Sequence, residues 1–211
     1  MKANVILKKL EPADLPKIAA VHMSSFPDSA LTKLGASIVE RYYLWHLTGP
    51  HKRVVATGAF IGDECVGFSF SGIFNGSVSG FIKKNKISLI KGVLMNPQHM
   101  LDPIYLGRIR TGVKLLRRFS ARNPIASCRH KSETVHYGIV SIAVSRDHQK
   151  EGIGQILILD AQEQAIKFGH QMICLTVNPE NEQAIRFYEK QNWQKMLQNG
   201  LWKGAMIKDL R

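Results

Sequence analysis

The stretch SIAVSRDHQKEGIGQILI, residues 141–158, decides the fold of this chain. It begins with apolar, β-branched residues typical of a buried strand, passes through a polar loop, and reaches Gly152-Ile153-Gly154 where apolar residues recur at helical spacing. A helix N-terminus exposes unpaired N–H groups and a partial positive charge, and glycines let a ligand approach the main chain closely. The stretch therefore predicts a strand, a loop suited to a phosphate, and a helix.

Two familiar phosphate-binding loops do not fit this stretch. A P-loop needs a Lys directly after its last glycine, and no Lys follows Gly154. A dinucleotide-binding fingerprint needs a third glycine where Leu157 stands. Taken alone, the two glycines are as compatible with a tight turn into a packed helix as with an anion site.

The rest of the chain alternates between helical and extended patterns. In chain order, the predicted elements are helices at 15–25 and 31–47, a hairpin at 53–74, a strand at 135–144, a helix at 154–168, a strand at 172–177, a helix that Asn178 caps, and closing strands at 193–197 and 205–210. This order predicts a single mixed α/β (α+β) domain, residues 1–211, around a central sheet.

Two longer patterns carry a family resemblance. The first strand ends in Ala143-Val144 and continues into Gln149-Lys150-Glu151-Gly152-Ile153-Gly154. Downstream, LTVNPENEQAIRFYEKQNW, residues 175–193, follows a strand with two asparagines and an aromatic pair. Together they resemble the GNAT superfamily of acetyl-CoA-dependent N-acetyltransferases. Asn192 stands where the family has glycine, and residues 81–131 show no counterpart in it.

The resemblance implies a fold and a donor. The fold would be a mixed central sheet, flanked by helices and splayed between its fourth and fifth strands, with a basic helical insertion at about 81–131. Acetyl-CoA would lie across the splayed strands as acyl donor, with no metal. It would be attacked directly by a primary amine of a small molecule, of which an amino sugar is one example.

The resemblance also implies roles for residues. Main-chain groups at the end of the first strand would bond the pantetheine arm, the loop amides would hold the pyrophosphate, and one of two asparagines would contact the cofactor arm. The residues implied to bind acetyl-CoA are Ile142, Ala143, Val144, Gln149, Lys150, Glu151, Gly152, Ile153, Gly154, Asn178 and Asn181. Tyr188 would be the general acid that protonates the leaving thiolate.

The general base is not identified by the sequence. The candidates near the expected cleft are His136, Ser141 and Glu133, each of which is better explained as a structural residue than as a catalytic one. His22 and Asp28 are candidates for the acceptor pocket.

The sequence argues against a disulfide framework, a zinc site, a signal peptide and a transmembrane segment. The three cysteines form no CxxC or CxxH pair, which argues against a disulfide framework or a zinc site. Lys8 and Lys9 interrupt the N-terminal apolar stretch, so no signal peptide is predicted and a cytoplasmic location is expected. Residues 54–82 are only weakly apolar and contain Asp63 and Glu64, so no transmembrane segment is predicted there.

The positive charge is concentrated in one segment. The chain of 211 residues carries a net charge of +13, of which residues 81–131 contribute +11. Around Tyr105 and Phe119 apolar residues recur at helical spacing among arginines, which predicts a basic amphipathic helix. Such a helix suits a phosphate-rich ligand or an anionic membrane surface, or it packs on the domain and leaves a solvated basic face.

Two functions therefore remain open from the sequence. The first is an N-acetyltransferase, and the second is a non-catalytic module of the same fold that binds acyl-CoA or nucleic acid. The sequence also leaves a homodimer open.

Overall fold

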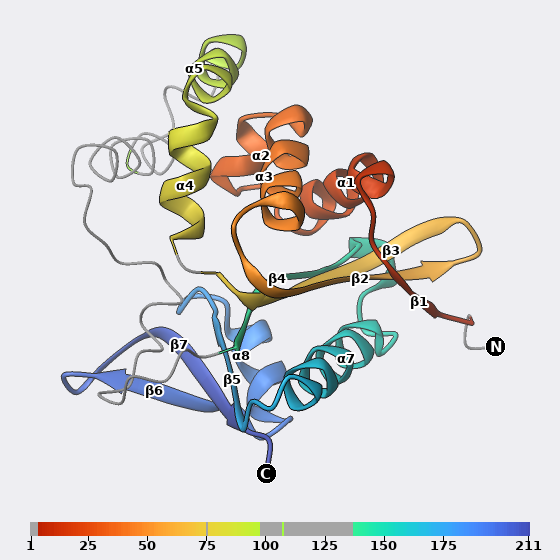
Figure 1. Ribbon diagram of the computed structural model, residues 1–211, viewed down its shortest axis with the longest axis vertical. Coiled ribbons are helices and arrows are strands. Elements are labelled where there is room, and N and C mark those ends of the chain that lie inside the picture. Colours follow the sequence, from red (N-terminus) through yellow and green to blue (C-terminus); the bar gives the residue numbers. More distant parts are fainter. Residues whose placement is uncertain (1–3, 75, 98–106, 108–136) are drawn as a thin grey trace.

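The protein is built on a seven-stranded mixed sheet with helices on both faces (Figure 1). The computed structural model describes residues 4–74, 76–97, 107 and 137–211. The strands are β1 Ile6–Lys9, β2 Lys52–Ile61, β3 Glu64–Ile73, β4 Tyr137–Val144, β5 Met172–Thr176, β6 Gln194–Gln198 and β7 Leu201–Asp209. Their order is β1-β2-β3-β4-β5-β7-β6, and β4 and β5 are the parallel pair among antiparallel neighbours. The predicted mixed α/β class is confirmed.

The helices form a layer on each face of the sheet (Figure 1). One layer contains α1 Leu15–Ser25, α2 Ala30–Lys33, α3 Ala36–Thr48, α4 Ser77–Lys84 and α5 Lys86–Met95. The other contains α7 Ile153–Lys167 and α8 Glu182–Glu189. Two short 3-10 helices, η1 Pro12–Asp14 and η4 Arg146–His148, lead into α1 and follow β4.

The sheet splays between β4 and β5, as the resemblance implies. The two strands pair only from Tyr137 opposite Ile173 to Ile139 opposite Leu175. Beyond that point β4 continues to Val144 and pairs with β3 alone. The second half of β4 therefore has a strand neighbour on one edge only.

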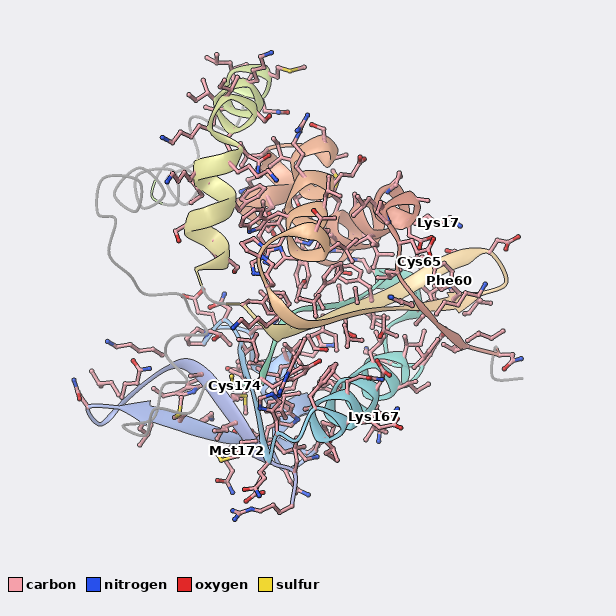
Figure 2. All side chains as sticks on the ribbon, viewed as in Figure 1. Lys17, Phe60, Cys65, Lys167, Met172 and Cys174 are labelled. Atoms are coloured by element: carbon pink, nitrogen blue, oxygen red, sulfur yellow. The ribbon has the colours of Figure 1, made fainter. Side chains whose placement is uncertain are left out.

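Apolar side chains fill the space between each helical layer and the sheet (Figure 2). On the α1 side, Tyr43 and Phe68 are fully buried. On the α7 side, Ile158 and Met206 are fully buried in a second cluster. Burial on both faces explains why the sequences of the central strands are nearly continuous runs of apolar residues. Each central strand is therefore held by side-chain packing on both faces of the sheet.

Three elements differ from the prediction. The expected helix at 31–47 is two helices, because Gly35 between them has a φ of +96°, which a helix cannot contain. Strand β1 was not predicted, because it is a short edge strand that contains Lys8 and Lys9. Helix α4 begins at Ser77, ahead of the helical insertion expected at about 81–131, whereas α5 lies within that range.

Some predictions fall outside the described residues. These are the amphipathic helix around Tyr105 and Phe119 and the candidate bases His136 and Glu133. Among the residues that are described, no helix has the length and apolar content needed to cross a bilayer.

Candidate active site

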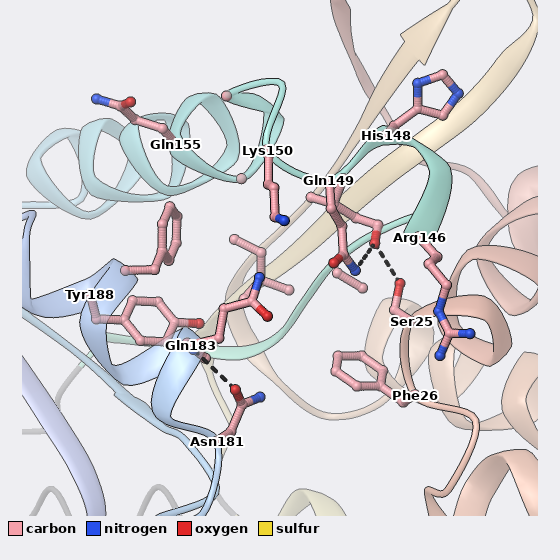
Figure 3. Close-up of a pocket in the computed structure, with 17 residues that line it drawn as sticks. Ser25, Phe26, Arg146, His148, Gln149, Lys150, Gln155, Asn181, Gln183 and Tyr188 are labelled. Carbon is pink, nitrogen blue, oxygen red and sulfur yellow. Dashed lines mark hydrogen bonds between the residues drawn. The ribbon is translucent and has the colours of Figure 1, made fainter.

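A cavity opens where β4 and β5 separate (Figure 3). Its volume is about 660 Å³. Its lining comes from the end of α1, β4 and the loop after it, the start of α7, and α8. The lining residues are Ser25, Phe26, Ile142, Ala143, Val144, Arg146, His148, Gln149, Lys150, Gly152, Gly154, Gln155, Asn181, Gln183, Ala184, Phe187 and Tyr188.

The loop after η4 presents a row of unpaired main-chain amides at one end of this cavity. None of the amides from Lys150 to Gly154 donates to another group of the described chain. Gly152 has a φ of +87° and Lys150 a φ of +69°, so the chain turns sharply just before α7 begins. Unpaired amides in such a turn, at the positive end of a helix, form an anion-binding concavity. The loop therefore has the geometry that a pyrophosphate needs.

The edge of β4 in the cavity is partly occupied by side chains. The carbonyl oxygen of Val144 lies 2.7 Å from the Ser25 hydroxyl and 3.2 Å from the Gln149 side-chain amide, both of which donate to it (Figure 3). A ligand that pairs with this carbonyl must displace one of these donors.

Tyr188 directs its hydroxyl into the cavity (Figure 3). The residue is buried, its ring packs against Phe187 and Trp193, and no other described group hydrogen-bonds its hydroxyl. Burial raises the pKa of Tyr188 above its ordinary value, so the phenol stays protonated at neutral pH. The cavity thus contains a neutral O–H donor that is not committed elsewhere.

The two asparagines before α8 have different roles. Asn181 is the N-cap of α8, and its side-chain oxygen accepts from the Ala184 amide at 3.0 Å. Asn178 accepts from the Glu180 amide at 3.2 Å in the preceding turn. The prediction that Asn178 caps the helix is wrong, because its oxygen closes this turn and the helix begins only at Glu182. Asn181 lines the cavity and Asn178 does not.

Replacing Asn181 by Ala is expected to lower the free energy of unfolding by about 1 kcal/mol, since the cap of α8 is lost. Asn178→Ala is the matched control, because it also removes one side-chain hydrogen bond but outside the helix. Urea denaturation of both variants measures the difference. Equal losses, or a larger loss for Asn178→Ala, would contradict the assignment of the cap.

The charge of the cavity wall is positive. Arg146 and Lys150 line it, and no Asp or Glu does so among the described residues. Glu151 lies outside, where its carboxylate is 3.2 Å from Nδ1 of His148. The wall therefore favours a polyanionic ligand over a cationic one.

The remaining candidates for the base and the acceptor pocket do not line the cavity. Ser141 and His22 belong instead to a hydrogen-bonded chain beside it, in which the Tyr43 hydroxyl lies 2.9 Å from Ser141 Oγ and 2.8 Å from His22 Nδ1. Burial lowers the pKa of His22 to about 4, so the ring is neutral at neutral pH. Asp28 is exposed and also lies outside the lining.

Most of the residues implied to bind acetyl-CoA meet at the cavity. The three that do not line it are Glu151, Ile153 and Asn178, and Ile153 is 1% exposed in the core beneath the loop. Ser25 and Phe26 were not predicted, since α1 reaches β4 only through the tertiary fold. Within the described chain, no group of three or more His, Cys, Asp or Glu is placed to hold a metal ion.

Comparison with known proteins connects this geometry to a family. Residues 114–193 match the sequence model of the Acetyltransferase (GNAT) family. These residues are thus similar to that family. The match begins inside residues 81–131, so the expectation that this whole segment lacks a family counterpart is wrong from residue 114 onward. A comparison with curated protein sequences finds no match.

Solved structures share the GNAT fold over nearly the whole chain. The protein PH1933 from Pyrococcus horikoshii is 18% identical with a TM-score of 0.60, covering 98% of each chain. An acetyltransferase from Thermus thermophilus is 14% identical with a TM-score of 0.57, covering 99% of each chain. The PaiA N-acetyltransferase of Thermoplasma acidophilum, solved with coenzyme A, is 13% identical with a TM-score of 0.58, covering 98% of this chain and 99% of its own.

The matched residues include the loop from Gln149 to Gly154, together with Asn181 and Tyr188.

Proposed function

We propose that this protein acetylates a primary amine of a small molecule, with an amino sugar as the first acceptor to test. The observation that carries the proposal is the cavity at the splayed strands, which has unpaired loop amides from Lys150 to Gly154 at one end and the Tyr188 hydroxyl within it. The amides suit the pyrophosphate of acetyl-CoA, and the hydroxyl suits the thioester sulfur.

The reaction is a direct attack. The neutral amine forms a nitrogen–carbon bond at the thioester carbonyl, the carbon–sulfur bond breaks, and the electron pair leaves on sulfur. Tyr188 donates its proton to that thiolate or stabilises its charge by a hydrogen bond. The amine also loses a proton, which a general base or water accepts.

The acceptor class follows from charge. The cavity wall contains Arg146 and Lys150 and no Asp or Glu of the described residues. Such a field attracts an acceptor that bears phosphate, for example a nucleotide-linked or lipid-linked amino sugar. We therefore place phosphorylated amino sugars ahead of free polyamines, which the same field repels.

Calorimetric titration with acetyl-CoA tests the donor site. Gly152→Glu puts a carboxylate beside the loop amides and is expected to weaken binding on the order of 100-fold, through charge repulsion and backbone strain. Gly169→Glu is the matched control, because Gly169 ends the same helix with a φ of +78° and, like Gly152, has open space around it. A wild-type protein that does not bind, or two variants that weaken binding equally, would contradict the assignment of the loop.

An acceptor screen tests the reaction itself. Release of free thiol from acetyl-CoA is followed with amino sugars, their nucleotide-linked forms, amino acids and polyamines. Thiol release with an amino sugar supports the proposal. Tight donor binding without release for any amine would favour the acyl-CoA-binding module over the enzyme.

A further inference from the structure

Helix α5 presents an apolar face to solvent at the end of the molecule farthest from β6 and β7 (Figure 1). Ile87 is 73% exposed, Ile90 60%, Leu94 69% and Met95 79%. At about 100° per residue, Ile87, Ile90 and Leu94 lie within one narrow sector of the helix. Single exposed apolar residues are ordinary, but four in one ten-residue helix form a patch.

The opposite side of α5 holds this patch in place. A Cβ at Gly92 would lie 3.1 Å from the Leu34 carbonyl oxygen and 3.3 Å from Ile38, so the helix backbone packs directly on the α2–α3 layer. The side-chain amide of Asn96 donates to the Gly92 carbonyl at the C-terminal end of the helix. The fold therefore fixes which face of α5 points outward.

The charged residues of α5 itself are both lysines. On the helical wheel Lys86 lies on one side of the apolar sector and Lys91 on the other. Residues 76–97 contain four lysines and no Asp or Glu. Helix α7 also exposes Leu159 and Ile166, but it carries Asp160 and Glu163 beside them. An apolar face with a purely basic border is thus particular to α5 among the described helices.

We propose that α5 docks this protein on an anionic lipid surface. Ile87, Ile90 and Leu94 enter the boundary between headgroups and acyl chains, while Lys86 and Lys91 contact lipid phosphates. Aliphatic residues favour a bilayer over a single-stranded nucleic acid, which binds mainly on aromatic side chains. The helix has ten residues, so it lies on the surface and does not span it. This inference is independent of the proposed acetylation.

Flotation of the full chain with vesicles tests the docking. Vesicles of phosphatidylcholine and phosphatidylglycerol in equal parts are compared with vesicles of phosphatidylcholine alone. We expect binding to the first, weakened by high salt because the contacts are electrostatic in part. The double variant Ile87→Asn/Leu94→Asn is expected to partition at least about tenfold less, because two inserting side chains are lost.

Two control variants distinguish the role of the α5 face from the general effects of added polar side chains and of a changed net charge. Leu197→Asn/Leu201→Asn alters side chains that are 61% and 65% exposed on the β6–β7 hairpin and is expected to bind vesicles like the wild type. Lys86→Glu/Lys91→Glu reverses the charge beside the patch and is expected to weaken binding to anionic vesicles. Lys190→Glu/Lys203→Glu changes the net charge equally, but away from α5, and is expected to weaken that binding less. Acetyl-CoA binding should stay unchanged in all four, which reports that the fold is intact.

Several outcomes would overturn the docking proposal. They are no flotation of the wild type, equal flotation with neutral vesicles, and equal losses for the α5 and control variants. Binding to single-stranded RNA that depends on α5 in place of vesicle binding would assign the face to nucleic acid. Self-association in sedimentation that Ile87→Asn/Leu94→Asn abolishes would assign it to a second copy of the chain.

Discussion

Replacing Tyr188 by Phe is expected to lower kcat by about 10²- to 10⁴-fold, the usual contribution of a general acid. The ring keeps its packing against Phe187 and Trp193, so only the hydroxyl in the cavity is lost. Acetyl-CoA should bind as before, because the loop amides are untouched. The measurements are thiol release under saturating substrates and calorimetric binding of the donor.

A second buried tyrosine supplies the control for this prediction. Tyr137 belongs to the same core cluster, and its hydroxyl lies 3.0 Å from Ser71 Oγ, outside the cavity lining. Tyr137→Phe should cost about 1 kcal/mol of stability, the worth of one hydrogen bond, and leave kcat unchanged. If Tyr188→Phe retained full turnover, the phenol would not be the acid and the thiolate would be protonated by water.

Acidification below neutral pH is expected to destabilise the protein strongly, because His22 and His46 are buried in neutral form. Burial lowers the pKa of each ring to about 4, and His46 is further lowered by the neighbouring His51. An unfolded chain has histidines with a pKa near 6.5, so between those values it binds more protons than the native state. The contribution of each neutral ring to the free energy of unfolding is therefore fully present above about pH 6.5. It falls as the pH approaches 4, by roughly 3 kcal/mol for each ring.

The surroundings of His46 explain its sensitivity. Its Nδ1 is 2.7 Å from the Tyr42 carbonyl oxygen, and its Nε2 has no partner among the described groups. The ring stacks on His51 at 5.5 Å, so a proton on one histidine disfavours a proton on the other. No carboxylate is positioned there to compensate for the charge within the described contacts.

Urea denaturation at a series of pH values measures this effect. A His46→Gln variant should lose less stability between pH 6.5 and 4 than the wild type, even if it is less stable at pH 7. The Asp209 carboxyl, whose pKa Arg211 lowers to about 2, acts only in more acidic solution and is thus separable. A flat stability profile between pH 6.5 and 4 would show that the rings are hydrated in solution.

The sequence predicts the site best where the chemistry is local. The β4 strand, its loop and α7 occupy one continuous stretch, residues 137–167, and each is specified by its own apolar pattern and glycines. Tyr188 and Asn181 are placed by α8, another continuous pattern. By contrast, Ser25 reaches the Val144 carbonyl across 119 positions of the chain, a contact that only tertiary packing determines.

The errors have equally local causes. Both Asn178 and Asn181 are good caps by residue type, and the choice between them depends on the turn that Asn178 closes. Gly35 divides a stretch whose apolar spacing continues across it, so periodicity alone extends the helix too far. Strand β1 depends on β2 for its hydrogen bonds and has little pattern of its own.

The halves of β4 should tolerate sequence change differently. At Gly138 and Ile139 the strand is paired on both edges, and the Ile139 side chain is buried in the core. From Ile142 to Val144 one edge offers only peptide groups, which every residue except proline carries in the same form. Recognition through that edge does not depend on which side chains are present. Proteins that share it can therefore diverge to 13% identity while conserving the geometry of their backbone.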